Sequence, residues 1–270
     1  MSICVLSRAA VFGVCAGWLG SAIADVPEIP DAPVAAQSLS GSKWKVSIGP
    51  GIMVSPKYPG ARAMAVLPLP SVDISYDDRV FSQALDVLGL NLLKGDDWHV
   101  GTAISFDFQS RNESDDPRLR GLGNVHAGPK LKLFADYSVS FVTGSVSAMQ
   151  DIAATGQGLL VSADLAANLP VTPKLPVSVG PGVTWANAVY TRTLFGVSPQ
   201  QSAASGMTAY GTSSGVRDVH LNGYASYDFT PHWTGSVAAT VGKLQRFAAD
   251  SPITQRKVEL NVFAGLNYRF

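Results

Sequence analysis

Four histidines are the side chains in this sequence best suited to acid–base chemistry: His99, His126, His220 and His232. Beside a serine, such a histidine could accept the hydroxyl proton and start lipid hydrolysis or acyl transfer. No Gly-x-Ser-x-Gly, His-Glu-x-x-His or similarly organised motif accompanies them, however. We therefore interpret all four as polar structural residues, and the sequence predicts neither a catalytic residue nor a cofactor.

A Gly-Pro-Gly triplet occurs twice, at 49–51 and at 180–182, each time within a Ser-aliphatic-Gly-Pro-Gly-aliphatic segment. No third glycine follows at the spacing of a dinucleotide site. The repeat could mark a duplication or an opening in a wall of strands. The interpretation we favour is that these glycines relieve crowding on the polar face of strands.

The acidic run Asn-Glu-Ser-Asp-Asp at 112–116 offers carboxylates that could bind a divalent cation or a cationic peptide. Most runs of this kind are solvated surface, and we interpret this one in the same way. No metal site is predicted from it.

The N-terminus carries the signals of an exported protein. Arg8 precedes an apolar stretch at 9–20, and the small residues at 21–24 form an Ala-x-Ala-type site, which predicts cleavage after Ala24. Both cysteines, Cys4 and Cys15, would leave with this signal peptide of residues 1–24. The proline-containing residues 25–42 are expected to form a flexible periplasmic leader.

The composition points to a membrane protein without spanning helices. The chain has 270 residues, only 15% of them charged, and a mean hydropathy of +0.17. No run of about 18 apolar residues follows the signal peptide. Lys and Arg (20) equal Asp and Glu (20), so the excess basic charge of a nucleic-acid-binding protein is missing.

Apolar and polar residues alternate with a period of two, which predicts that the chain crosses the membrane with β-strands. The last segment shows it best, because apolar residues occupy every second position from Val258 to Phe270, and only Phe263 breaks the polar series between them. A helix does not give this spacing. The alternating segments have about ten or more residues, and aromatic residues such as Trp44, Tyr58 and Tyr190 lie near their ends, where the aromatic girdles of a membrane interface are expected. Both features favour a transmembrane β-barrel over a soluble β-sandwich.

Eleven strand segments can be delimited between residues 43 and 270: 43–55, 63–77, 79–94, 97–110, 123–136, 137–150, 157–170, 174–187, 215–229, 231–246 and 257–270. Bacterial barrels normally have an even number of strands. We therefore predict an all-β, up-and-down antiparallel barrel of twelve strands, with ten as the second choice and a strand missed or merged around 79–94.

The connections between these segments predict an orientation. Tight periplasmic turns are expected at 136–137, 172–173 and 230–231, and extracellular loops at 111–122, 151–156, 188–214 and 247–256. Within the longest loop, the segment from Ser198 to Gly206, with Pro199 near its start, predicts a short helix.

The polar face of the strands carries both signs of charge: Lys43, Lys45, Lys130, Lys132, Arg217, Asp107, Asp164 and Asp228. Such charges can pair across a narrow lumen and fill it, or they can line a narrow water path. The sequence leaves both alternatives open.

Several short motifs, weak one by one, occur in a specific order: Pro56-Lys57-Tyr58-Pro59-Gly60, Pro68-Leu69-Pro70, Arg111 with Leu119 and Gly121 in the segment that follows, Tyr190 with Phe195-Gly196-Val197, Ser251-Pro252-Ile253-Thr254, and the terminal Tyr268-Arg269-Phe270. In this respect the chain resembles the MipA/OmpV family of outer-membrane proteins. The resemblance spans the whole mature barrel and leaves out the leader.

The resemblance implies an outer-membrane, non-enzymatic barrel that acts as a scaffold for murein-remodelling enzymes, namely a lytic transglycosylase and a peptidoglycan synthase. It carries no residue-level site. Other expected partners are outer-membrane lipid and the barrel-assembly machinery, which would engage the C-terminal strand ending at Phe270. A narrow pore, or a permeability or stress-response protein, is the alternative function.

Overall fold

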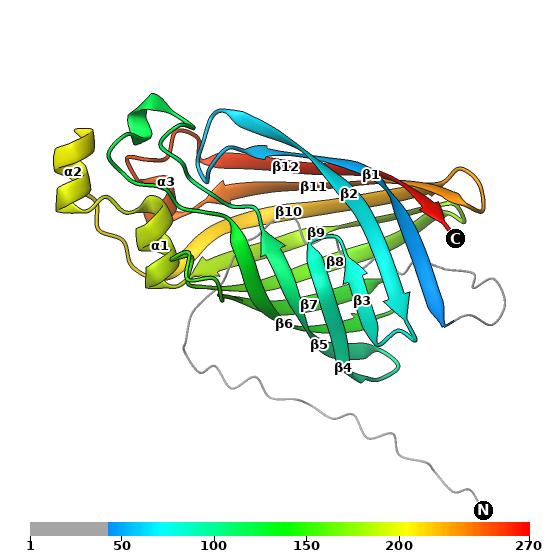
Figure 1. Cartoon of the computed structure of the whole chain (residues 1–270). Coiled ribbons are helices and arrows are strands. Elements are labelled where there is room, and N and C mark those ends of the chain that lie inside the picture. Colours follow the sequence, from blue (N-terminus) through cyan, green and yellow to red (C-terminus); the bar gives the residue numbers. More distant parts are fainter. Residues whose placement is uncertain (1–42) are drawn as a thin grey trace, which may run out of the picture.

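The computed structural model describes residues 43–270, which form a closed barrel of twelve antiparallel strands (Figure 1). The expected signal peptide (1–24) and leader (25–42) lie outside the described residues. The strands are β1 (Trp44–Pro56), β2 (Met64–Tyr76), β3 (Val80–Gln83), β4 (Asp86–Lys94), β5 (Trp98–Asp107), β6 (Gly128–Val139), β7 (Val142–Asp151), β8 (Leu159–Thr172), β9 (Leu175–Ala186), β10 (Gly215–Asp228), β11 (Trp233–Leu244) and β12 (Val258–Arg269).

Each strand pairs with its neighbours in sequence, and β1 pairs with β12 to close the sheet. The prediction of a twelve-stranded up-and-down barrel is therefore confirmed, and the second choice of ten is wrong. A sandwich is excluded as well, because the strands form one closed sheet.

The segment 79–94, expected as one strand, is a hairpin. β3 and β4 are separated by Ala84 and Leu85, and Ala84 turns the chain with a φ of 50°. The sequence hid this turn because neither residue is the glycine, proline or asparagine that normally marks one. The count of eleven had merged the two strands of this hairpin into one.

The turn expected at 136–137 is also misplaced. Asp136 and Tyr137 lie within β6 and pair with Ser145 and Gly144 of β7, so the chain turns at residues 140–141 instead. Ser140 adopts a φ of 58° there. Tyr137 is 56% exposed on the outer face, as expected of an interfacial aromatic on a strand. The expected turns at 172–173 and 230–231 are confirmed at 173–174 and 229–232.

The two faces of the sheet differ as the alternation predicts. On β10, Val219 and Leu221 are 43% and 52% exposed, whereas Asn222, the next residue along the strand, is buried. Exposed aliphatic side chains of this kind recur on β4, β8, β11 and β12 and form an apolar belt around the barrel. An apolar belt that surrounds the whole barrel would be unfavourable in water, so we infer that the outer surface of the barrel contacts the lipid of a membrane.

Helices occur only in the long loops of the described part. The predicted helix is confirmed as α2 (Pro199–Ser205), where Ser198 and Gln201 form a capping box and Gly206 ends the helix at a φ of 75°. The sequence did not predict α1 (Ala188–Phe195), α3 (Arg246–Ala249) or the 3-10 turn η1 (Pro117–Leu119). None of the helices within 43–270 is long and apolar enough to cross a membrane.

Candidate functional site

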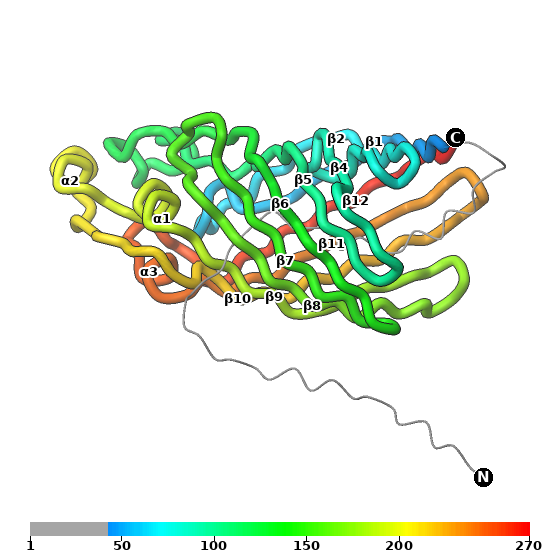
Figure 2. The backbone as a smooth tube through the Cα atoms, turned by 90° about the horizontal axis from the view of Figure 1, so that it is seen from below, coloured from blue at the N-terminus to red at the C-terminus, as the bar shows by residue number. Residues whose placement is uncertain are grey.

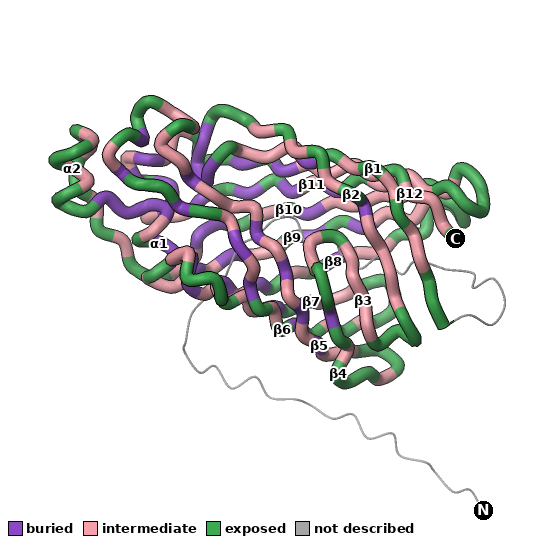
Figure 3. The backbone as a smooth tube through the Cα atoms, viewed as in Figure 1, coloured by how far each residue is buried: buried purple, intermediate pink, exposed green. Residues whose placement is uncertain are grey.

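The barrel has one plain end and one capped end (Figures 1 and 2). Residue 43, the C-terminus and the short turns lie at the plain end, and the helices and long loops lie at the other. In bacterial outer-membrane barrels the short turns face the periplasm and the long loops face outward. The capped end is therefore the extracellular one, and buried residues gather toward it (Figure 3).

The long loops meet each other across the mouth of the barrel. One buried cluster takes residues from four different loops, namely Tyr58, Ala61, Leu119, Leu122, Val197 and Ile253. We refer to the structure formed by the long loops and their helices as the cap.

Contacts between opposite loops show that the cap spans the mouth. Arg118 donates from Nη2 to the carbonyl of Pro252 at 2.9 Å, and Gln255 donates from Nε2 to Oδ2 of Asp116 at 2.5 Å. These bonds join the β5–β6 loop to the β11–β12 loop, and the two loops leave the closed sheet six strands apart. The cap therefore crosses the full diameter of the barrel.

Arg111 lies at the centre of the cap with 2% of its surface exposed. Its guanidinium donates to the carbonyls of Leu194 at 3.1 Å and Leu122 at 3.4 Å. Burial lowers the pKa of Arg111 to about 10. Burial, followed by the charge of Asp116, raises the pKa of Tyr58 to about 12. Both shifts indicate a cap interior that solvates charge poorly.

Two glycines allow the loops of the cap to approach closely. Gly60 (φ 82°) donates its N–H to Oε1 of Glu259 at 2.5 Å, and a side chain there would meet Thr254. Gly121 (φ 86°) lies so close to Ala204 of α2 that a Cβ would be 2.7 Å from its carbonyl carbon. Other residues lack room at these positions and rarely adopt these φ values.

Most of the residues on which the family resemblance rests belong to this cap. Within it lie Tyr58, Gly60, Arg111, Leu119, Gly121, Tyr190, Phe195 and Gly196. Pro56 ends β1 just below the cap, Pro68 and Pro70 lie on β2, and Phe270 follows β12 at the periplasmic end. Tyr58 and Tyr190 are therefore buried cap residues, and the expectation that they are interfacial aromatics is wrong.

Paired charges fill the lumen directly beneath the cap. Lys130 contacts Asp107, and Arg217 contacts Asp218 at 2.7 Å, with all four side chains at most 3% exposed. Arg217 also donates to the hydroxyl of Tyr190 at 2.7 Å. The predicted interior of mixed charge is confirmed here. Lys43 and Lys45 instead lie at the exposed periplasmic rim.

The histidines are dispersed along the barrel. The ring of His220 is held between Asp164 at 2.8 Å and Asp218 at 2.9 Å, and that of His99 contacts Asp136 at 3.1 Å. His232 stacks on Tyr268 at the periplasmic end. The backbone of His126 accepts a bond from Gln157. Carboxylates hold His220 and His99 in place, as expected of structural polar residues.

The acidic run at 112–116 forms hydrogen bonds within its own loop, besides the bond that Asp116 accepts from Gln255 of the opposite loop. Glu113 accepts bonds from the N–H groups of Gly121 at 3.1 Å and Gly123 at 2.8 Å, and Asp116 caps η1 through Arg118 at 2.9 Å. Within 43–270, no group of three or more His, Cys, Asp and Glu side chains could hold a metal ion.

The second glycine of each Gly-Pro-Gly triplet faces the lumen where it is crowded. The first glycine lies against the neighbouring strand, because a Cβ at Gly49 or Gly180 would collide with the backbone oxygen of Leu266 or Leu165. A Cβ at Gly51 would lie 2.8 Å from Cζ of Phe263, and one at Gly182 would collide with the Asp164–His220 pair. This geometry favours the relief of crowding over a duplication. It also explains Phe263, which breaks the alternation of the last strand because it fills the lumen with an aromatic ring.

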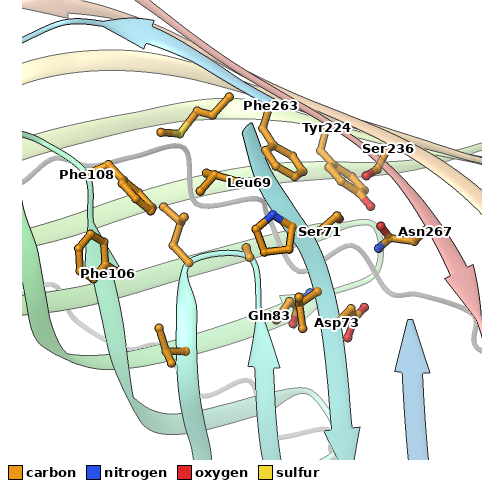
Figure 4. A pocket seen from close by; sticks show the side chains of 16 residues that line it. Leu69, Ser71, Asp73, Gln83, Phe106, Phe108, Tyr224, Ser236, Phe263 and Asn267 are labelled. Carbon is orange, nitrogen blue, oxygen red and sulfur yellow. The ribbon is translucent and has the colours of Figure 1, made fainter. Parts of the chain in front are cut away.

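An apolar cavity of about 380 Å³, which was not predicted from the sequence, lies beside Phe263 (Figure 4). It lies where the barrel wall is thinned by the short β3–β4 hairpin, and Leu69, Phe106, Phe108, Asp73 and Asn267 are among its lining residues. The pattern break at Phe263 was the only signal that could have indicated it.

The comparison that decides the family is a match of residues 48–270 to the model of the MltA-interacting protein MipA. The chain belongs to the MipA family. It is accordingly a non-enzymatic barrel of the outer membrane. A search of curated proteins gives no match.

Solved structures similar to this MipA-family chain are bacterial outer-membrane barrels. A Salmonella typhi OmpF complex with daunomycin is 9% identical, with 85% of this chain and 98% of that one covered and a TM-score of 0.39. The translocator domain of the autotransporter NalP from Neisseria meningitidis is 13% identical, with 86% and 90% covered and a TM-score of 0.40. The CymD monoaromatic hydrocarbon channel is 9% identical, with 84% and 88% covered and a TM-score of 0.41. These likenesses concern barrel architecture alone.

Proposed function

We propose that this barrel is an outer-membrane docking platform for a lytic transglycosylase, and that it brings this enzyme together with a peptidoglycan synthase. The observation that carries the proposal is membership in a family described as MltA-interacting. Both enzyme classes act on the cell wall, so their contacts with the barrel must lie on its periplasmic side.

The two ends of the barrel suit a protein that docks enzymes on its periplasmic side and does not conduct solutes. The cap crosses the outer mouth, and buried ion pairs fill the lumen beneath it, which disfavours the alternative of a narrow pore. The periplasmic end presents short turns at 77–79, 95–97, 140–141, 173–174 and 229–232. These turns stay exposed while the barrel holds them in fixed positions.

An acidic corner is the most distinctive feature of the periplasmic end. It comprises Asp77 and Asp78 on one turn and Asp96 and Asp97 on the next. Lys43 pairs with Asp77 at 3.0 Å, and Asp78 pairs with Lys45 at 2.7 Å and with Lys94 at 3.6 Å. Asp96 and Asp97 are exposed and supply the carboxylates left for a partner. Carboxylates on a fixed rim can steer a basic surface of a partner into register.

Site-specific photocrosslinking in intact cells tests the proposal. A photoreactive residue is placed at Asp96, Ser140 or Lys174, which are exposed periplasmic turn residues, and at Gln200 of α2 as the extracellular control. We expect adducts with a lytic transglycosylase and a peptidoglycan synthase at one or more turns and at no control position. Mass spectrometry of the adducts identifies them.

Two further variants sharpen the result. Replacement of Asp96 and Asp97 by lysine reverses the charge of the corner and should weaken the adducts, and removal of residues 25–42 tests the leader as a second docking segment. Adducts with barrel-assembly machinery alone, or equal adducts from Gln200, would show that the scaffold role does not apply to this chain.

A further inference from the structure

The barrel wall is interrupted on its extracellular half. β2 has thirteen residues, but only Asp73–Tyr76 pair with β3, which has four residues and turns back at Ala84 and Leu85. β4 then begins opposite Ser105 of β5. Above this level, residues 64–72 of β2 pair only with β1. A lateral gap therefore separates the upper part of β2 from the upper part of β5.

The free edge of β2 is protected by prolines. Pro70 lies opposite Pro50 of β1, and since neither has an N–H, the two form a pair without hydrogen bonds. The backbone groups of Pro68 and Pro70 on β2 consequently point toward the gap. Both positions lack the donor that a bare edge would expose to lipid or to another strand. These two motif residues thus make an open edge tolerable.

The gap opens within the apolar belt. Val66 on β2 and Val87 on β4 flank it, and each is 61% exposed. Val87 also lines the cavity behind the gap. Alkyl chains of the bilayer therefore contact the opening directly. An occupant can reach it sideways from the membrane, while the cap crosses the axial route from outside.

The cavity of about 380 Å³ lies behind this gap and connects the outer face with the lumen. Its lining includes Phe106, which belongs to the outward-facing series of β5, as well as Leu69 and Met53, which face the lumen. Small-molecule sites typically have about 300–1,000 Å³ and mostly apolar walls. The volume suits one alkyl chain better than the several chains of an outer-leaflet lipid.

The polar groups of the cavity gather at one side (Figure 4). Asp73, Gln83 and Asn267 lie together toward the periplasmic half, whereas Phe106 and Phe108 lie at the opposite side. The carboxylate of Asp73, which lies within the influence of Arg269 and Lys45, accepts hydrogen bonds from cationic or neutral donors. The cavity thus combines an apolar entrance with a polar inner end.

We propose that the gap between β2 and β5 is a lateral binding site for a single-chain amphiphile with a cationic or neutral head group, which enters from the bilayer. The head lies at Asp73 and Gln83, and the alkyl chain lies between Leu69 and Phe106 at the opening. The proposal does not rest on the docking function. It concerns the side wall of the barrel between β2 and β5, whereas the docking function concerns the periplasmic turns.

Photolabelling of the full mature chain in phosphatidylcholine nanodiscs tests the site. The probes are a long-chain alkylamine, the alkanoic acid of equal length and a diacyl phospholipid, each with a diazirine on the chain. We expect the amine to label peptides of β2, the β3–β4 hairpin and β5, about tenfold more strongly than the acid, as a charge-assisted bond implies. The diacyl probe should label the belt evenly.

Three variants locate the site. Leu69→Trp fills the cavity and should abolish the focused labelling. Leu221→Trp, on the lipid face of β10 and outside the cavity lining, is the control and should leave it unchanged. Asp73→Asn should remove the preference for the amine over the acid. Leu85→Trp at the rim provides a second block in case Leu69→Trp fails to fold, which loss of heat-resistant gel mobility reveals.

The outcomes are distinct. Even labelling around the belt by the amine, stronger focused labelling by the diacyl probe, or unchanged labelling in both folded tryptophan variants would overturn the lateral site. An acid preference would overturn the assignment of the head group to Asp73. Because periplasmic crosslinks to cell-wall enzymes do not involve this cavity, either proposal can fail without the other.

Discussion

The two ends of the barrel use charge in opposite ways. Beneath the cap, Lys130 and Asp107 are 1% and 3% exposed. At the periplasmic rim, Lys43 and Asp77 are 59% and 42% exposed. The first pair has lost its water and depends on its partner, whereas the second stays solvated and contributes little. The outer end is thus built to stay shut and the inner end to stay accessible.

The strongest test of this comparison replaces one partner at each end. Lys130→Met leaves the carboxylate of Asp107 buried without a counter-charge, and we expect a loss of about 3–5 kcal/mol in the free energy of unfolding. Lys43→Met should cost less than about 1 kcal/mol. Denaturant unfolding of the refolded barrel in lipid vesicles measures both. Equal losses would contradict the distinction between the two ends.

The next largest effect is expected at Arg111. Arg111→Ala removes the donor that ties the β5–β6 loop to Leu194 of α1, and we expect a loss of about 2–3 kcal/mol because bonds to charged groups are strong. Loosened loops should also become sensitive to chymotrypsin. Arg192→Ala, which removes an exposed arginine of α1, is the matched control and should resist cleavage as the unmodified chain does.

A smaller loss of stability is expected when the hydrogen bond between the cap and the lumen charges is removed. Tyr190→Phe deletes only the hydroxyl that accepts from Arg217 at 2.7 Å, and the expected loss is about 1–2 kcal/mol. Tyr227→Phe, on the lipid face of β10, should have no measurable effect. If both variants unfold at the same denaturant concentration as the parent, the link between cap and lumen charges is not stabilising.

The smallest effect concerns the periplasmic rim and depends on pH. The hydrogen bond from Lys45 lowers the pKa of Asp78, so the pair stabilises the folded state above the ordinary aspartate pKa of about 3.9. That contribution is lost as the pH falls through the lowered value. Because both groups are almost half exposed, Lys45→Met should cost under about 1 kcal/mol at pH 7.

A pH and salt series checks this last prediction. The difference in unfolding free energy between the parent and Lys45→Met should shrink toward zero as the solution is acidified, and also in about 1 M salt, where surface charges are screened. A difference that persists under both conditions would indicate that Lys45 acts through packing of its alkyl stem.

The strand pattern was predictable because each strand obeys a local rule. Outward residues meet lipid, so Val219 and Leu221 are apolar wherever their distant partners lie. The rule fails where the environment changes, as at Phe263, which packs inside the lumen. It also fails at Ala84, where the left-handed turn has no residue that signals it. α1 was missed although Asn187 caps its start and Gly196 its end.

The cap could not be predicted for a different reason. Its contacts join loops far apart in sequence, such as Arg118 with Pro252, and no local spacing records such a pairing. The motif residues Gly60 and Arg111 were identified by resemblance alone, and Tyr58 was expected at the membrane interface instead of in a buried cap. Their shared role becomes visible only once the barrel brings the loops to one end.

The seam between β1 and β12 has a consequence for how the molecule forms. Ser47 pairs with Arg269 and Val54 with Val262, residues roughly 200 positions apart. Pairings of such high contact order form slowly, because the entropy of closing a long loop is lost before any bond is gained. The first strand must wait with an open edge until the last one arrives. Until the seam closes, the unpaired edge of β1 is a site at which another strand could pair wrongly, so closure protects the chain from aggregation as well as completing the fold.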